Sequence, residues 1–367
     1  MEFRNYTPFP GMAFKQYAPS AELFGIAALR GSFRIVIDQP LALAPVQAPL
    51  ALADVYEPPD VRPEDAELVT VGDIVPFKPG TDVTVRAVAH TPQGRPEPSW
   101  EAGFRIGPLE RLVRVHGPRY WQPTRDATGA FGWHLSESEP CRSVPVSWRL
   151  AHGGWAPGTD DGEKPSEPHL SNPLGPGQLD AELSPRDRPL PAPRIEAVDA
   201  PITDWRDDPA PQGLAPLPPY WEPRASRAGT YDERWLYAQH PFLPPDFEYA
   251  FYQSAPPEQV IEPWLAGAER MALIHLHPLY RVLCFDLPGL EPVAVVRRIT
   301  GEMEAIRMAL DGVHVDLLAA EARVFLTWRT AFPWKEGVRV AEARLLDKGR
   351  LAALPPADAE AVGGGAG

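Results

Sequence analysis

The clearest pattern of hydrophobic and polar positions lies between Thr81 and His90. Apolar and polar residues alternate there. Side chains two residues apart share one face of a strand, so this period of two predicts a half-buried β-strand. The turn sequence Lys78-Pro79-Gly80 precedes it. Similar patterns predict further β structure in the first third of the chain: a strand or hairpin at Leu23 to Asp38, and strands at Phe104 to Ile106, Leu109 to Val115 and Ser143 to Leu150. Within the clearest strand, the apolar face is formed by Val83, Val85, Ala87 and Ala89, and the other face by Thr84, Arg86 and His90.

The last third of the chain returns to strand patterns. Arg281 to Asp286 and Pro292 to Ile299 flank a Leu-Pro-Gly turn, which predicts a β-hairpin. Glu321 to Arg329 and Gly337 to Leu345 predict a second hairpin in the same way. Between the two regions of strands, Ala255 to Ala268 is compatible with a short helix.

Residues 156–224 differ from both flanking regions, because prolines gather there without a hydrophobic period. The chain contains 47 prolines, roughly two to three times the usual share of about 5%. Fixed φ angles and missing N–H donors favour turns and extended connections over long helices. We expect this segment to wrap over the β core, with mobile patches such as Pro157 to Glu167, or to become ordered on a partner. The aromatic anchors for such a wrap are Trp155, Trp205, Tyr220 and Trp221.

These patterns predict a mainly β protein, with antiparallel β-sandwich-like lobes, a long proline-rich irregular wrap and little helix. We expect an N-terminal β-rich lobe at residues 1–155 and the proline-rich segment, packed on the core, at 156–224. An aromatic loop and a C-terminal β-rich lobe follow at 225–350. The tail at 351–367, which ends in a glycine-rich run, is predicted to be disordered.

Composition narrows the class of partner. A net charge of −14 without a cluster of Lys and Arg argues against nucleic acid and anionic lipid. A run of about 18 apolar residues, as a membrane helix needs, is missing, and so is the pattern of a secretory signal. Cys141 and Cys284 form no disulfide framework and no metal-like pair. We therefore expect a soluble, cytoplasmic protein with reduced thiols that binds neither nucleic acid nor membrane.

Candidate catalytic and metal motifs are weak. His275 and His277 would share one face of a strand and could both bind zinc, with Cys284 or Asp286 nearest in sequence as a third ligand. His152-Gly153-Gly154 resembles a glycine-rich oxyanion loop, but a Gly-x-Ser-x-Gly nucleophile motif is missing, so a tight turn is the better interpretation. Asp232 and Glu233 are the place to look for a pair of catalytic carboxylates, although structural ion pairs with Arg224 or Arg234 explain them as well. We expect no catalytic residue, no metal and no cofactor.

The stretch from Trp221 to Phe247 is the most informative part of the sequence. Large aromatic residues, prolines and paired charges crowd together there without helical or strand periodicity. Such a segment must be fixed by specific contacts, and Trp, Tyr and Arg are the residue types that anchor protein interfaces. Burial against the protein's own core explains each of these residues as well. The predicted partner-binding residues are Trp221, Arg224, Tyr231, Asp232, Trp235, Asp246 and Phe247, with Tyr249 and Phe251 as further anchors.

Several blocks of sequence match, in order, a known protein family. The chain resembles the domain of unknown function 2169 family over nearly its whole length, from about Pro8 to Val340. The most specific blocks are Gly72-Asp73-Ile74-Val75-Pro76-Phe77-Lys78-Pro79-Gly80-Thr81-Asp82-Val83 and Ala228-Gly229-Thr230-Tyr231-Asp232-x-x-Trp235. Further matches are Thr7-Pro8-Phe9, Gln39-Pro40, Asp54-x-Tyr56, Gly117-Pro118-Arg119-x-Trp121, His152-Gly153-Gly154, Asn172-Pro173-Leu174-Gly175, Trp221-x-Pro223-Arg224, Pro244-x-Asp246-Phe247 and Leu326-Thr327-Trp328-Arg329.

The resemblance implies a role that is not enzymatic. Members of the family look like cytoplasmic adaptors or chaperones of bacterial type VI secretion, which hold an effector, often with a PAAR domain, and help load it onto the VgrG spike protein. The family carries no accepted catalytic residues. Leu150 and His152 depart from its usual pattern, and Pro157 to Glu167 matches no part of it. The alternatives are a carbohydrate- or metal-active enzyme with an unfamiliar site and a structural component of the secretion tip.

Overall fold

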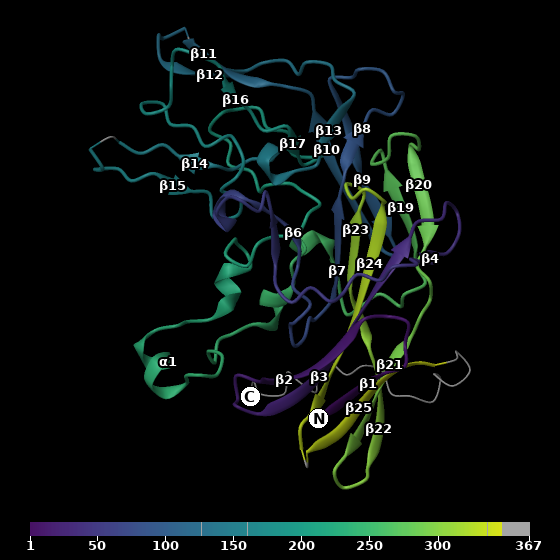
Figure 1. The fold of residues 1–367 in the computed structure, drawn as a ribbon. Coiled ribbons are helices and arrows are strands. Elements are labelled where there is room, and N and C mark those ends of the chain that lie inside the picture. Colours follow the sequence, from purple (N-terminus) through teal and green to yellow (C-terminus); the bar gives the residue numbers. More distant parts are fainter. Residues whose placement is uncertain (126, 160, 336, 347–367) are drawn as a thin grey trace.

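The computed structural model describes residues 1–346 except 126, 160 and 336. Strands dominate these residues and most neighbouring strands run antiparallel, which confirms the prediction of a mainly β fold (Figure 1). The single α-helix in this part of the chain is α1 (Glu233–Ala238). None of the helices within the described residues is long and apolar enough to cross a membrane.

The largest sheet joins the two ends of the chain. Its strands are antiparallel except for the parallel pair of β7 and β23. The strand β3 is buried along almost its whole length. In order across the sheet, the strands are β18 (Val260–Ile261), β7 (Thr81–Arg86), β23 (Ala309–Asp316), β24 (Arg323–Pro333), β3 (Leu23–Arg34) and β2 (Gly11–Tyr17), with β4 (Ala42–Leu43) paired to β3.

Two further sheets complete the main core. One hydrophobic cluster includes buried residues of all three large sheets, so they share a single core. The five-stranded sheet has the order β17 (Ile195–Glu196), β10 (Leu109–His116), β9 (Ser99–Ile106), β19 (Arg270–Ile274) and β20 (Val282–Asp286). The four-stranded sheet has the order β1 (Glu2–Asn5), β25 (Val338–Leu345), β21 (Pro292–Arg298) and β22 (Met303–Arg307).

The remaining strands form small sheets at the periphery. One has the order β12 (Phe131–Leu135), β11 (Tyr120–Arg125) and β16 (Leu190–Pro191), and the others are the pairs β13 (Ser143–Pro145) with β8 (Val88–His90), β14 (Trp155–Ala156) with β15 (Glu167–Pro168), and β5 (Val55–Glu57) with β6 (Glu67–Thr70). Short 3-10 turns occur at Pro63–Asp65, Trp148–Leu150, Ala225–Ala228, Tyr249–Tyr252 and Pro257–Gln259.

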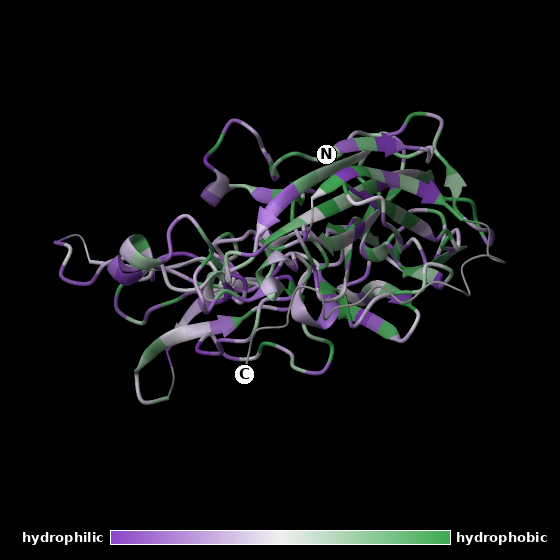
Figure 2. Ribbon diagram, turned by 90° about the horizontal axis from the view of Figure 1, so that it is seen from below, coloured by the Kyte–Doolittle hydropathy of each residue, from purple (hydrophilic) through white to green (hydrophobic). Residues whose placement is uncertain are grey.

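The alternating patterns locate strands correctly, although not all of their ends. The predicted apolar face of the strand at 81–90 is buried in the main core, and this strand divides at Ala87 into β7 and β8. Leu23 to Asp38 forms a strand only as far as Arg34, and the strand predicted to run to Leu150 ends at Pro145. Figure 2 shows hydrophilic and hydrophobic residues alternating along several strands.

Both predicted hairpins of the last third are wrong. The strand β20 pairs with β19 in one sheet, whereas β21 pairs with β22 and β25 in another. Likewise β24 pairs with β23 and β3, whereas β25 pairs with β21 and β1. Strand patterns that follow one another along the chain therefore belong to different sheets, and the connections carry the chain from one sheet to the next.

The predicted short helix at 255–268 is also wrong. Pro256, Pro257 and Pro263 lack backbone N–H donors and restrict the residues before them, which interrupts a helical ladder. The segment forms a 3-10 turn at Pro257–Gln259 and the short strand β18 on the edge of the largest sheet.

The predicted division into lobes stays a prediction, but the strands are interleaved along the chain. The largest and the five-stranded sheets both combine strands from 1–155 with strands from 225–350. The proline-rich segment at 156–224 adds β16 and β17 to two sheets and places Trp221 in the main core. Trp205 packs on Trp133, whereas Trp155 is 54% exposed and is no core anchor. The tail predicted to be disordered, 351–367, lies outside the described residues.

The most specific block of the resemblance, residues 72–83, forms a buried polar centre. The Asp82 carboxylate accepts hydrogen bonds from Lys78 Nζ at 2.7 Å, Gln253 Nε2 at 2.7 Å and the Ser254 hydroxyl at 2.9 Å. Burial alone would raise the pKa of Asp82, but the charge of Lys78 and these hydrogen bonds outweigh it and lower the pKa. The motif therefore ties residues 253–255 to β7.

Candidate partner-binding site

The predicted interface segment leaves the body of the protein at Trp221 and Arg224. Trp221 is only 1% exposed and its ring meets that of Trp148 edge to face. Arg224 is 5% exposed and donates from Nε to the Phe251 carbonyl at 2.9 Å and from Nη1 to the Leu217 carbonyl at 2.5 Å. Both side chains therefore fix the base of the segment and neither can be a first contact for a partner.

Residues 229–247, which we name the α1 arm, extend from this base to one side of the sheets (Figure 1). Gly229 starts the arm with a positive φ of 79°, where a Cβ atom would lie 2.9 Å from Pro244 Cβ. Thr230 donates from its backbone N at 3.0 Å and from its hydroxyl at 2.7 Å to the Asp246 carboxylate. Asp246 thus closes the two ends of the arm on each other.

The helix α1 is fixed by its own polar residues. Asp232 is the N-cap, and its carboxylate accepts from the Trp235 backbone N at 2.8 Å. The Trp235 indole donates to the Phe242 carbonyl at 2.9 Å, and its ring meets that of Tyr231 at 4.7 Å. A six-residue helix is marginal alone, so these contacts hold its shape.

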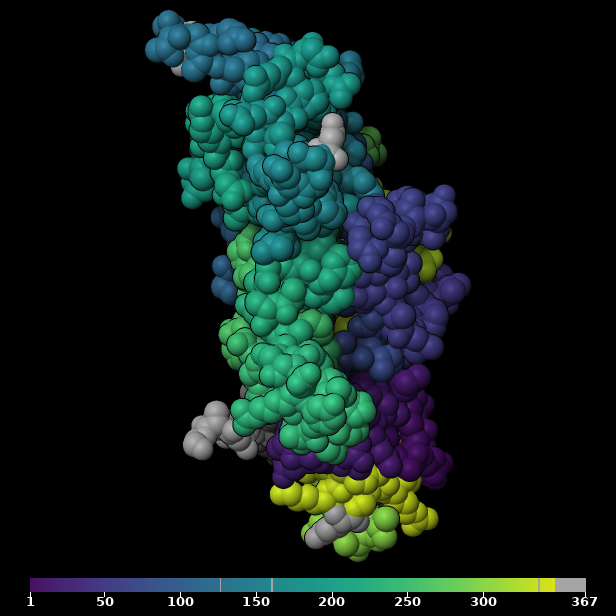
Figure 3. Space-filling view, turned by 90° about the vertical axis from the view of Figure 1, so that its left-hand side faces the viewer, coloured from purple at the N-terminus to yellow at the C-terminus, as the bar shows by residue number. Residues whose placement is uncertain are grey.

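The arm also touches the first hairpin of the chain. Gln239 Nε2 donates to the Pro19 carbonyl at 2.6 Å, and Phe242 meets Tyr17 edge to face at 5.1 Å. Figure 3 shows the arm in green beside the purple N-terminal residues on the same face. The strand β2, which ends at Tyr17, lies at the edge of the largest sheet. The arm and this strand edge therefore form one surface.

Large apolar side chains face solvent on this surface. Tyr237 is 85% exposed, Tyr231 52%, Leu236 51% and Tyr17 48%. Exposed carboxylates belong to the same stretch of chain, at Asp232, Glu233, Asp246 and Glu248, and outnumber the exposed Arg234. Exposed aromatic groups on a fixed support, with an acidic rim, are typical of a protein-binding surface. Phe247, by contrast, is 8% exposed and packs with the rings of Tyr249, Phe251 and Tyr252 under the arm.

Hydrogen bonding and burial shift the pKa values of two groups in the arm, Asp246 and Tyr231. The backbone N–H and hydroxyl of Thr230 lower the pKa of Asp246, so this carboxylate is charged at neutral pH. Burial, assisted by the negative charge of Asp246, raises the pKa of Tyr231, so its phenol keeps its proton. The surface therefore offers neutral aromatic groups next to fixed negative charge.

The structure divides the seven predicted binding residues into two groups. Tyr231, Asp232 and Asp246 are exposed, and Trp235 is half-buried. Trp221, Arg224 and Phe247 are buried supports. The sequence analysis did not select Leu236, Tyr237 and Tyr17, which are exposed on the same surface. Leu236 and Tyr237 follow Trp235 directly in α1, and no hydrophobic period in this segment marked them as exposed.

The sequence model of the family described as "Uncharacterized protein conserved in bacteria (DUF2169)" matches residues 21–329. The chain belongs to the DUF2169 family. Comparison with curated proteins and with solved structures finds no match. The family membership predicted from the motifs is therefore confirmed.

The His275 and His277 pair of this DUF2169 protein is not on a strand. The strand β19 ends at Ile274, and His275 adopts a positive φ of 54°. Among the described residues, one group of three side chains holds its potential metal-ligand atoms within 4.8 Å of one another, and it consists of His152, His169 and Asp208. The pair with Cys284 or Asp286 does not form such a group.

The group of His152, His169 and Asp208 is arranged as a hydrogen-bonded clasp. Asp208 Oδ1 lies 2.9 Å from His152 Nε2 and 3.5 Å from His169 Nε2. The backbone N–H groups of Ser171 and Asn172 donate to His169 Nδ1, so the neutral ring carries its proton on Nε2 and donates it to Asp208. A metal would need a free lone pair on that same nitrogen.

The His-Gly-Gly and Asn-Pro-Leu-Gly motifs of the family meet in this clasp. Asn172 is fully buried, and its Nδ2 donates to the carbonyls of Trp148 and His152. Asn172 therefore holds Gly153 and Gly154, which lie between the 3-10 turn at Trp148–Leu150 and β14 rather than directly after a strand as predicted. Asp232, named above as a place to look for a catalytic carboxylate, is occupied as a helix cap.

Proposed function

We propose that this DUF2169 protein is a non-catalytic cytoplasmic adaptor, or chaperone, for a type VI secretion effector with a PAAR domain, and that it helps to load this effector onto the VgrG spike protein. One observation of the structure carries the proposal. The α1 arm exposes Tyr231, Leu236 and Tyr237 on a support that is fixed by buried anchors and by hydrogen bonds. The family motifs supply the effector, PAAR and VgrG parts of the proposal.

The physical argument concerns exposed apolar groups. An effector that waits for secretion carries apolar surface that would otherwise aggregate, and a chaperone covers it. Large aromatic groups that are already ordered lose little conformational entropy on binding, which leaves more of the interaction energy for affinity. The acidic rim of the arm favours a client segment with Lys or Arg beside its apolar residues.

The edge of β2 supplies a second means of binding next to the arm. An edge strand has unpaired backbone groups and can accept a strand of a partner. In this proposal, a client element lies on the arm through side chains and along β2 through its backbone. The predicted binding residues Asp232 and Asp246 then shape the surface, whereas Trp221, Arg224, Trp235 and Phe247 support it.

Co-expression with the effector encoded beside it tests this function. The tagged protein is expressed with and without the effector, and the products are compared by pull-down and size-exclusion chromatography. We expect a stable complex, and an effector that is soluble only when both are made together. An effector that is stable alone and elutes separately would contradict the adaptor role.

A further inference from the structure

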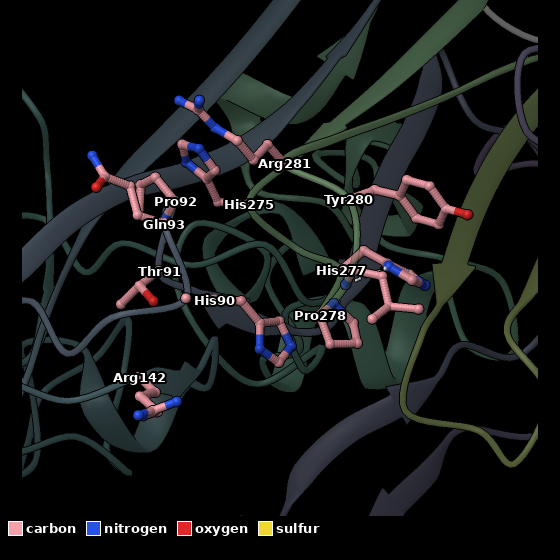
Figure 4. A pocket seen from close by; sticks show the side chains of 12 residues that line it. His90, Thr91, Pro92, Gln93, Arg142, His275, His277, Pro278, Tyr280 and Arg281 are labelled. Atoms are coloured by element: carbon pink, nitrogen blue, oxygen red, sulfur yellow. Dashed lines mark hydrogen bonds between the residues drawn. The ribbon is translucent and has the colours of Figure 1, made fainter.

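A cavity distant from the α1 arm contains positively charged and imidazole side chains in its lining. It has a volume of about 400 Å³ and lies between the residues that follow β8, the segment before β13 and the loop from β19 to β20. Figure 1 places β8 and β20 on the opposite side of the molecule from α1. Figure 4 shows the side chains that surround this space, among them His90, Thr91, Arg142, His275, His277 and Arg281.

The charge of this cavity is opposite to that of the whole chain. The net charge of the protein is −14, yet the lining contains two arginines and three histidines and neither Asp nor Glu. Within the described part of the chain, the guanidinium groups of Arg142 and Arg281 have no hydrogen-bond or ion-pair partner. Many other arginines of the protein are paired, for example Arg105 with Glu110 at 2.6 Å. A free guanidinium binds carboxylate or phosphate oxygens in a bidentate manner.

An unsatisfied hydroxyl group provides independent support. Thr91 is only 7% exposed and lines the cavity, and its Oγ1 has no hydrogen-bond partner. Buried polar atoms are nearly always paired, and an exception requires an explanation such as an absent ligand or water. The Thr91 hydroxyl can donate to an anion held by the two arginines.

The cavity is formed before any ligand binds. Three backbone hydrogen bonds join its segments: His90 N to the His275 carbonyl at 2.7 Å, Thr91 N to the Arg142 carbonyl at 3.0 Å and His275 N to the Arg281 carbonyl at 2.8 Å. The His275 Nδ1–H donates to the Glu101 carbonyl at 2.6 Å and so fixes the left-handed turn at this residue. A pre-formed site loses little entropy on binding.

The histidines add donors without fixed charge. The Leu279 backbone N donates to His277 Nδ1, so the neutral ring carries a proton on Nε2 that can be donated to a ligand. Burial lowers the pKa of His277. Burial also lowers the pKa of His90, and the charge of the nearby His277 lowers it further. The cavity thus disfavours protonation of His90 and His277 to their positively charged forms.

We propose that this cavity binds a small organic anion through a phosphate or carboxylate group. Arg142 and Arg281 hold the anionic oxygens, and Thr91 and His277 donate further hydrogen bonds. The volume of about 400 Å³ is within the usual range for small-molecule sites and exceeds that of a single inorganic anion. The site is independent of the proposed adaptor role, because it shares no residue with the α1 arm.

Isothermal titration calorimetry of the full chain with inorganic phosphate and with citrate tests this proposal. Sodium chloride is used to keep the ionic strength constant. The variants are Arg142→Gln, Arg281→Gln and Thr91→Val. Arg105→Gln, an exposed arginine on β9 outside the cavity, is the matched control. Thermal unfolding of each variant establishes that it is folded.

We expect one or both anions to bind the unchanged protein at concentrations up to about 10 mM. Arg142→Gln and Arg281→Gln should each weaken binding by about tenfold, Thr91→Val by a smaller factor, and Arg105→Gln not at all. Binding of only one anion identifies phosphate or carboxylate as the group recognised. Failure of both anions to bind, or equal binding by folded cavity variants and the control, would overturn the proposal.

Discussion

The buried polar centre at Asp82 and the α1 arm carry the two most specific sequence blocks of this protein, and the structure gives them opposite roles. At Asp82, charged side chains are inside the protein, and the carboxylate accepts several hydrogen bonds. In the arm, charged side chains fix the backbone from outside, and the aromatic groups remain in solvent. A specific motif therefore identifies a family but does not reveal whether a residue supports the fold or contacts a partner. The burial of each side chain separates these two roles.

The largest effect is expected at the buried centre. Asp82→Ala would leave the Lys78 ammonium, which is buried, without its partner, and would orphan the donors of Gln253 and Ser254. Breaking a buried ion pair by removing one member costs about 3–5 kcal/mol. Urea unfolding should show this loss, whereas Glu110→Ala, at an exposed ion pair, should change stability by less than about 1 kcal/mol. A stable Asp82→Ala protein would show that the centre is not structural.

Arg224 joins the two regions, since it is buried like the centre but supports the arm. Arg224→Ala leaves the Leu217 and Phe251 carbonyls without their donor. An orphaned buried group costs about 1–3 kcal/mol, and the site of the Phe251 carbonyl is only partly buried, so we expect a stability loss of about 2–4 kcal/mol, measured by urea unfolding. Client binding should weaken as well, because the base of the arm loosens. Normal stability together with lost binding would instead identify Arg224 as a direct contact.

A third prediction concerns the pH dependence of stability at a buried carboxylate outside the arm, Glu196. Burial would raise the pKa of Glu196, but hydrogen bonds from His116 and Arg119 lower it from 4.5 to about 2. A folded-state pKa below the unfolded value stabilises the protein above pH 4.5, and this contribution is lost as the pH falls towards 2.

Glu196→Gln should therefore be less stable at pH 7, by about 1.5–3 kcal/mol for hydrogen bonds to a charged group. It should lose less further stability than the unchanged protein between pH 4.5 and 2. Chemical unfolding at a series of pH values measures both quantities. Parallel stability curves for the two proteins would contradict the assigned role of Glu196.

The smallest effect is expected in the arm. Thr230→Val removes the hydroxyl that donates to Asp246 but keeps the backbone N–H bond and the side-chain shape. Loss of one exposed hydrogen bond should cost less than about 1 kcal/mol of stability, because the site is open to water. Client affinity should fall by a few-fold, as measured by calorimetry. A large loss of stability here would mean that the arm belongs to the folding core.

Local patterns predicted the strands but not their partners. Alternation at Val83 and Val85 is visible because one face of β7 meets the core. Whether β21 pairs with β20 or with β25 depends on how the chain crosses between sheets, and the Leu-Pro-Gly turn after β20 contains no information about that. The prolines that prevent a helix at 255–268 are visible in the sequence, but the pairing of β18 with β7 is not.

The candidate site was predictable in position but not in its contact residues. Crowded aromatic groups indicated that residues 221–247 are special. Hydrophobicity alone could not separate Trp221, at 1% exposed, from Tyr237, at 85%, because an irregular segment has no period to mark its inner face. The three members of the clasp, His152, His169 and Asp208, are far apart in sequence, so no local motif predicted that they meet.

The affinity of the α1 arm for its client tests the central claim most directly. Tyr231, Leu236 and Tyr237 are replaced together by Ala, and Val46→Ala with Ile299→Ala, at exposed positions outside the arm, is the matched control. We predict at least about tenfold weaker binding for the arm variant, with stability within about 1 kcal/mol of the unchanged protein, and unchanged binding for the control. A folded arm variant that binds its client with full affinity would contradict the account.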